Sequence, residues 1–401
     1  MPDSYKRRPL TENVRAFDEW IRTRFVELNT ELEELYFAQA NRASVDGIGA
    51  ALKEELVAEG RNFIVRLLNE GNTDEGFERG FDLLGNVGIY MGACRRHEIT
   101  EPSRERSSPL IEASALALQL GASLGVAPRF ATSHLVTHNQ AIDGVYKSFT
   151  SLESEYLFLE YNGRGVLAYK RAADALVRIP PMGISHPLAH ELLLTAEQGL
   201  QDVARSNEEL HQNLDTDRFF YCVRPYYKPY RVGLHEYRGA NAGDFAGINE
   251  IDLLLGLCQA DHSSYSQLLV DKFLYIMPED QKRLRDAMRQ QSLLDSLLEQ
   301  ADVSGASTWF RKNAAVFLRV CDAHGAAAAQ HHDQLVKKFI EQPAKALPEQ
   351  NLEGITASGP PLPVVVSALE KLRDLRRAAD RDDIPSRYKD LEKIRAIVGT
   401  S

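Results

Sequence analysis

The chain has 401 residues, of which 44% are hydrophobic and 26% charged, so a large hydrophobic core is possible and disorder of most of the chain is excluded. Its 47 Lys and Arg against 57 Asp and Glu give a net charge of −10, which argues against nucleic-acid binding through phosphate neutralisation. No apolar run approaches the about 20 residues of a membrane helix, and no apolar core follows the charged first residues. We therefore expect a cytoplasmic protein.

Apolar residues recur at spacings of three and four along most of the chain, which predicts an all-α fold. The expected helical stripes are 17–35, 47–70, 75–96, 108–124, 186–213, 245–275, 279–300, 306–341 and 362–378. The exception is 156–169, where two apolar runs flank Asn162-Gly163, a typical turn, so a short hairpin is expected there.

Breaks in this pattern suggest how the chain is organised. The polar run 101–109 is a candidate boundary, so we divide the chain into an N-terminal helical part, 1–110, and a larger helical domain, 111–401. Prolines and glycines in 343–363 predict a long loop, and such loops are often functional. The mixed-sign run 371–377 is interpreted as the solvated face of a helix.

The cysteines form no C-x-x-C pair, which excludes the usual zinc-finger, iron–sulfur and thioredoxin patterns. At this chain length we expect them to be buried free thiols. They are Cys94, Cys222, Cys258 and Cys321.

His332 lies on the apolar stripe of the helix predicted at 306–341, whereas the adjacent His331 faces polar residues. The apolar residues that share its face are Leu335, Val336 and Phe339, and the small residues before it are Gly325, Ala328 and Ala329. This pattern predicts a groove of small side chains beside an inward-facing imidazole. Haem needs both an axial imidazole and room for its macrocycle, although a buried histidine bonded to a carbonyl is the simpler interpretation of these residues alone.

Two other pairs of residues that include histidine have the spacing of metal ligands. Glu208 and His211 form one Glu-x-x-His unit of a di-iron bundle, but no other histidine has an acidic residue three positions before it. His186 and His190 are four apart, as in zinc sites, but no third ligand is apparent.

The run 224–233 contains three tyrosines and three cations. Aromatic walls with a fixed guanidinium suit a planar substrate that carries a carboxylate, and an ordinary amphipathic loop is the alternative. The small-residue loop 239–243 allows close approach of backbone amides to a ligand. It is not a G-x-G-x-x-G motif after a strand, so nucleotide binding is poorly supported.

Taken in chain order, these segments resemble the monodechloroaminopyrrolnitrin synthase (PrnB) family, within the indoleamine/tryptophan 2,3-dioxygenase haem superfamily. The matching stretches are Leu124 to Arg129 with His134 and Asn139, Val223 to Gly233, Gly239 to Pro278, His332 to Ile340 and Thr356 to Gly359. The resemblance implies an all-α enzyme that uses O2 and haem b to oxidise or rearrange a tryptophan-like amino acid, in specialised metabolism and with an electron donor as a further partner.

The resemblance also implies a role for particular residues. His332 would be the proximal ligand of the haem iron, and His134 a catalytic residue near the distal side. Arg224 would bind the substrate carboxylate, with Tyr227 in the wall and Ser358 near the substrate. The loop of Gly239, Ala240, Asn241, Ala242 and Gly243 would close over the haem.

This sequence departs from the family pattern at Asn241 and Asp244, where the dioxygenases favour Ser and Gln, and this concerns the substrate rather than the haem ligand. Two alternatives remain open. One is a binding protein for haem or an aromatic ligand on the same scaffold, and the other is a non-haem di-iron oxygenase that uses Glu208 and His211.

Overall fold

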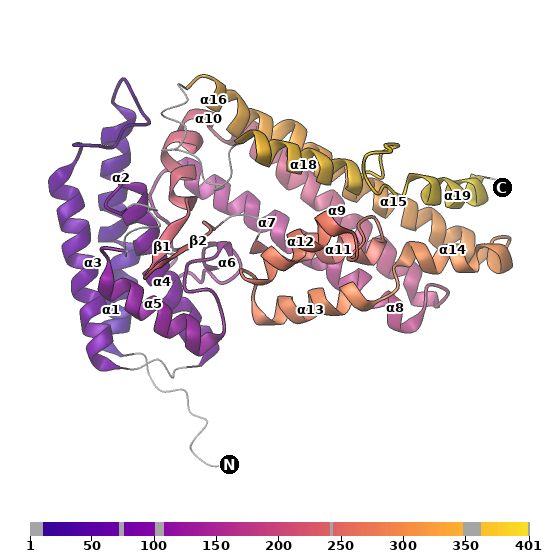
Figure 1. Ribbon diagram of the computed structural model, residues 1–401, viewed down its shortest axis with the longest axis horizontal. Helices are drawn as coiled ribbons and strands as arrows, with labels where there is room; N and C mark the ends of the chain where they lie inside the picture. The colour runs from indigo at the N-terminus through magenta and orange to yellow at the C-terminus, as the bar shows by residue number, and fades with distance from the viewer. Residues whose placement is uncertain (1–10, 72–75, 101–107, 241–243, 348–361, 400–401) are drawn as a thin grey trace, which may run out of the picture. The chain divides into compact units, whose positions relative to one another are not determined.

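The computed structural model describes residues 11–71, 76–100, 108–240, 244–347 and 362–399 (Figure 1). The chain is 72% helical, which confirms the all-α prediction. It divides into two compact units. The first unit comprises Met1–Leu159, Leu214–Asp244 and Gln342–Pro361, and the second comprises Glu160–Asn213, Phe245–Glu341 and Leu362–Ser401. The predicted boundary at 110–111 thus falls inside the first unit.

The first unit is built mainly from helices of the N-terminal third. Its elements are α1 (Glu12–Arg22), α2 (Arg24–Phe37), α3 (Ala50–Glu70), α4 (Phe77–Arg96), α5 (Ile111–Leu124), α6 (Thr132–Leu135), α10 (Thr216–Arg218), the π-helix η2 (Phe219–Val223), the 3-10 helix η3 (Arg224–Tyr227), β1 (Tyr230–Val232), β2 (His235–Tyr237) and α16 (Gln342–Lys345). Thr11 caps α1 by accepting a hydrogen bond from the Val14 N–H. The predicted stripe 17–35 is two helices, because the backbone leaves the helical region at Thr23.

The second unit contains the longer helices of the C-terminal part. They are α8 (Ile179–Met182), α9 (Pro187–Asn213), α11 (Gly247–Leu255), α12 (Ser263–Phe273), α13 (Pro278–Arg289), α14 (Leu293–Ser304), α15 (Thr308–Gln330), the π-helix η5 (His331–Glu341), α18 (Leu362–Arg376) and α19 (Tyr388–Gly399). The stripe predicted at 245–275 breaks at Gly256, whose φ of 80° ends α11. The stripe 306–341 is continuous, with α15 passing directly into η5.

The hairpin predicted at 156–169 is wrong, because this segment lies within helix α7 (Glu153–Leu176). Its buried apolar residues fall on one side of the helix and are Val166, Ala168, Ala172, Ala173, Ala175 and Leu176. Gly199 of α9 lets the two helices come close, since a Cβ there would lie 3.0 Å from the Ala168 carbonyl oxygen. The hairpin of this fold is β1–β2, with Tyr230 opposite Tyr237 and a turn at Gly233, whose φ is 59°.

Two further sequence predictions have clear outcomes. The four cysteines are buried free thiols, as predicted. The interpretation of 371–377 as a solvated face is wrong, because the side chains of Arg373, Asp374 and Arg376 are 17%, 10% and 15% exposed and all three are in ion pairs. Among the helices that the structure describes, none is long and apolar enough to span a membrane.

A buried ion pair holds α2 and α4 of the first unit together. Arg96 Nε and Nη2 lie 2.7 Å from the two carboxylate oxygens of Glu33, and Nη2 also donates to the Tyr221 carbonyl. The side chains are 1% and 0% exposed. Removing one partner of such a pair leaves the other charge buried and uncompensated.

We predict that Arg96→Met lowers the free energy of unfolding by about 3–5 kcal/mol, measured by urea denaturation. The control is Arg61→Met, because Arg61 pairs with Glu112 at a position where its side chain is 63% exposed. That variant should lose less than about 1 kcal/mol. Equal losses in the two variants would contradict this account.

Candidate functional site

His332 is the second residue of η5, and its ring is buried. Its Nδ1 lies 3.0 Å from Asp333 Oδ1. Its Nε2 is buried and has no hydrogen-bond partner among the residues that the structure describes. His331 is exposed, so the adjacent histidines face opposite environments, as their helical positions predict. Single π-helical turns are frequent at functional sites, and η5 extends over 11 residues.

The contact with Asp333 selects one tautomer of His332. A carboxylate oxygen only accepts hydrogen bonds, so the 3.0 Å contact is a hydrogen bond when Nδ1 carries the proton, which leaves the lone pair on Nε2. A buried lone pair without a donor is unfavourable unless a ligand binds there. A carboxylate on the second ring nitrogen is the usual arrangement of a metal-binding histidine. His332 and Asp333 therefore fit the ligation of haem iron through Nε2.

Asp333 Oδ1 also accepts two other hydrogen bonds, from Arg373 Nη1 at 3.0 Å and Lys337 Nζ at 3.3 Å. Partial burial alone would raise the pKa of Asp333. The hydrogen bonds from His332 and Lys337, with the charges of Arg373 and Lys337, outweigh burial and lower this pKa below its ordinary value. Asp333 is therefore a carboxylate at neutral pH.

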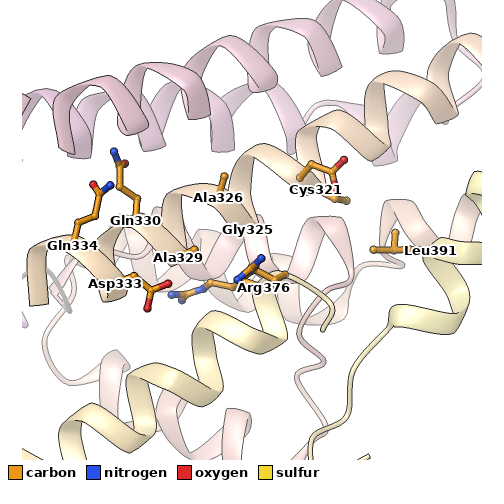
Figure 2. A pocket seen from close by; sticks show the side chains of 11 residues that line it. Cys321, Gly325, Ala326, Ala329, Gln330, Asp333, Gln334, Arg376 and Leu391 are labelled. Carbon is orange, nitrogen blue, oxygen red and sulfur yellow. The ribbon is translucent and has the colours of Figure 1, made fainter. Parts of the chain in front are cut away.

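One hollow of the structure contains part of the small-residue groove that the sequence predicts. A hollow of about 570 Å³ runs along α15 and is lined by Cys321, Asp322, Gly325, Ala326, Ala329, Gln330, Asp333, Gln334, Arg376, Arg377 and Leu391. Gly325 and Ala329 belong to it, but His332 does not. Figure 2 shows Asp333 and Arg376 on its lower side, with Gln330 and Gln334 extending from the opposite side of the helix. Gly325 and Ala329 line this hollow because they share a helix face with Asp333 at intervals of four.

The described residues offer no cluster of three or more His, Cys, Asp or Glu side chains for a metal ion. Glu208 instead accepts a hydrogen bond from Gln212, and the His211 carbonyl accepts one from Lys338. His190 is hydrogen-bonded to Asn313. The di-iron and zinc alternatives therefore lack a ligand set in this part of the chain.

In the first unit, η3 carries Arg224 and Tyr227, both buried. The guanidinium of Arg224 lies 5.7 Å from the centroid of the Phe220 ring, and burial lowers its pKa to about 10, so it remains a cation at neutral pH. The Tyr227 ring packs among aromatic rings at centroid distances of 5.7–6.0 Å, those of Phe130, Phe149 and Phe158. Its hydroxyl has no hydrogen-bond partner among the described residues.

The small-residue loop begins against the backbone of the same segment. A Cβ on Gly239 would lie 1.9 Å from the Tyr227 carbonyl oxygen, so only glycine fits there. Ala240 is fully buried. Asn241, Ala242, Gly243 and Ser358 lie outside the described residues. Asp244 pairs with the buried Arg129 at 2.8 Å, which gives this departure from the family pattern a structural role.

The geometry of His134 does not support the catalytic role predicted for it. Its Nδ1 accepts the Ala131 N–H at 2.8 Å, so its Nε2–H donates to the Phe81 carbonyl at 2.9 Å. The ring stacks on Phe81 with centroids 3.8 Å apart. Burial, with the nearby charge of Lys147, lowers its pKa to about 3. Both nitrogens are thus occupied by backbone, and neither is left for a substrate.

This role of His134 predicts a pH dependence. The unfolded histidine binds a proton below pH 6.5 and the folded one does not, so stability is full above pH 6.5 and falls as the pH decreases toward 3. Between pH 7 and pH 5 the loss from this residue should be about 2 kcal/mol. Urea denaturation at several pH values measures this effect. The stability of His134→Gln should fall less between pH 7 and pH 5 than that of wild type, whereas the variant of the exposed His235, His235→Gln, should show the wild-type loss. Parallel slopes for wild type and His134→Gln would contradict the assignment.

Comparison with known protein families agrees with the resemblance seen in the sequence. A family model described as monodechloroaminopyrrolnitrin synthase PrnB matches residues 11–398. The match includes η3, the start of the small-residue loop and His332, and it covers nearly all of the described structure. The chain therefore belongs to the monodechloroaminopyrrolnitrin synthase PrnB family.

Proposed function

We propose that this protein is a haem-dependent enzyme that uses O2 to oxidise or rearrange a tryptophan-like amino acid in the cytoplasm. Family membership supports an enzyme of this general kind. The observation that supports haem as the cofactor is the buried Nε2 of His332. This nitrogen has no hydrogen-bond partner among the described residues, whereas Nδ1 is hydrogen-bonded to Asp333. Haem b would supply the oxygen chemistry, which amino-acid side chains do not provide.

His332 would hold the haem iron through Nε2, with Asp333 fixing the orientation of the ring. Arg224 would bind the substrate carboxylate. Its burial and low local dielectric would make this charge-assisted contact stronger than one in water. Tyr227, with the rings around it, would form an apolar wall for an aromatic side chain.

The loop of Gly239 to Gly243 and Ser358 enter the proposal through the family resemblance. Gly239 ties the start of the loop to the segment of Arg224 and Tyr227, because it packs against the Tyr227 carbonyl. A loop that covers the substrate would exclude water from it and keep the carboxylate contact desolvated. His134 is left out of the catalytic set because backbone groups occupy both of its nitrogens.

We predict that His332→Ala loses stoichiometric haem, because the variant lacks the imidazole that would hold the iron. The measurement is the absorption spectrum of protein purified from haem-supplemented cells, together with an iron count per chain. The matched control is His331→Ala, since His331 is adjacent but exposed. Full haem content with an unchanged Soret band in His332→Ala would refute the assignment.

We predict that Arg224→Leu weakens binding of tryptophan by about 1.5–3 kcal/mol, the usual value of a hydrogen bond to a charged group. Spectroscopic titration of the haem-loaded protein measures the binding constant. The control is Arg218→Leu in the same segment, because Arg218 pairs with Glu34 and lies over the ring of Phe37. An unchanged constant in Arg224→Leu would remove Arg224 from this role.

Turnover separates an enzyme from a carrier of haem or of an aromatic ligand. Consumption of O2 that depends on an added tryptophan or halogenated tryptophan, with one haem per chain, would support the enzyme. Tight binding of haem and of the tryptophan analogue without O2 consumption would favour the carrier.

A further inference from the structure

Asp333 and Arg373 continue a chain of polar contacts that begins at His332. Arg373 Nη1 lies 3.0 Å from Asp333 Oδ1 and 3.4 Å from His332 Nδ1. The same Oδ1 accepts the His332 Nδ1–H and a bond from Lys337. One carboxylate oxygen therefore serves the imidazole and two cations together.

We propose that Asp333, Arg373 and Lys337 set the electron donation of His332 toward the iron that it holds, with Arg373 as the dominant positioning residue. This inference rests on the proposed haem ligation by His332. Asp333 and the two cations act on the ring in opposite directions. Asp333 attracts the Nδ1 proton and makes the imidazole a stronger donor, whereas the cations withdraw charge from Asp333 and weaken this effect.

The exposures of the side chains rank the two cations. The Arg373 side chain is 17% exposed, whereas that of Lys337 is 49% exposed. Solvent screens the charge of the more exposed Lys337, and Arg373 is also closer to Asp333 Oδ1. Arg373 therefore acts on Asp333 more strongly. Lys337 adds a smaller effect in the same direction.

Arg373 is held in place by contacts along α18. Its Nε donates to Asp374 Oδ1 at 2.8 Å. One turn later, Arg376 binds both oxygens of the fully buried Asp252, which also accepts a hydrogen bond from His324 Nε2 at 2.7 Å. A guanidinium fixed in this way applies its charge to Asp333 without a cost for ordering the side chain.

The experiment measures the ferric/ferrous midpoint potential of the haem-loaded protein and the iron–histidine stretching frequency of its reduced form. Asp333→Asn makes the imidazole a weaker donor, so the potential should rise and the frequency should fall. Arg373→Gln removes a positive charge that weakens the effect of Asp333 on the imidazole, so the potential should fall and the frequency should rise. Lys337→Gln should shift both quantities in the direction of Arg373→Gln, but less.

Two further variants separate charge from structure. Arg373→Lys keeps the charge and should restore most of the wild-type potential. Arg381→Gln breaks the other ion pair of Asp374 without touching Asp333, so it should leave the potential unchanged. General loosening of the site would move the Asp333 and Arg373 variants in the same direction, and this outcome would overturn the proposal.

Unchanged potentials in both variants, at one haem per chain, would also overturn it. Failure of the proposed function has a different signature, because wild-type protein would then bind no haem. If Asp333→Asn loses haem, the two Arg373 variants decide whether the proposal holds. Arg373→Gln must then lower the potential and raise the stretching frequency, and Arg373→Lys must return both toward the wild-type values.

Discussion

The hydrogen bond between His332 Nδ1 and Asp333 determines which ring nitrogen can bind anything else. Because Nδ1 carries the proton, the lone pair lies on Nε2, which is buried without a donor among the described residues. A buried lone pair is costly unless a hydrogen-bond donor or a metal ion meets it. This constraint is the observation that supports the proposed haem ligation.

The same constraint gives α18 its importance in the second unit. Its arginines pair with two carboxylates of the unit, Arg373 with Asp333 and Arg376 with Asp252. Asp252 is fully buried, and the Arg376 and His324 contacts lower its pKa against the effect of burial. Without Arg376 of α18, the buried charge of Asp252 would lose its guanidinium partner, which is strongly unfavourable. The helix thus stabilises the fold and acts on the candidate ligand through the same pairs.

In the first unit, close packing constrains the segment that carries Arg224 and Tyr227. Gly239 approaches the Tyr227 carbonyl so closely that no side chain fits, and aromatic rings surround Tyr227. The placement of Arg224 and Tyr227 is therefore part of the core rather than of a free loop. This differs from the amphipathic loop that the sequence alone permits.

The sequence by itself determined the helical class, the buried thiols and the inward position of His332, because each depends on local spacing and hydrophobicity. Tertiary structure decided what spacing does not encode. The segment 156–169 is a helix because Ala168, with Ala172 of the same helix, packs against Gly199 of α9. His134 is saturated by the backbone of Ala131 and of Phe81, and the Phe81 contact joins residues 53 positions apart. The role of Arg373 was also hidden, since it meets Asp333 across 40 residues of chain and its own segment looks like a solvated surface. Contacts between distant residues depend on how helices pack, and packing overrides local propensity.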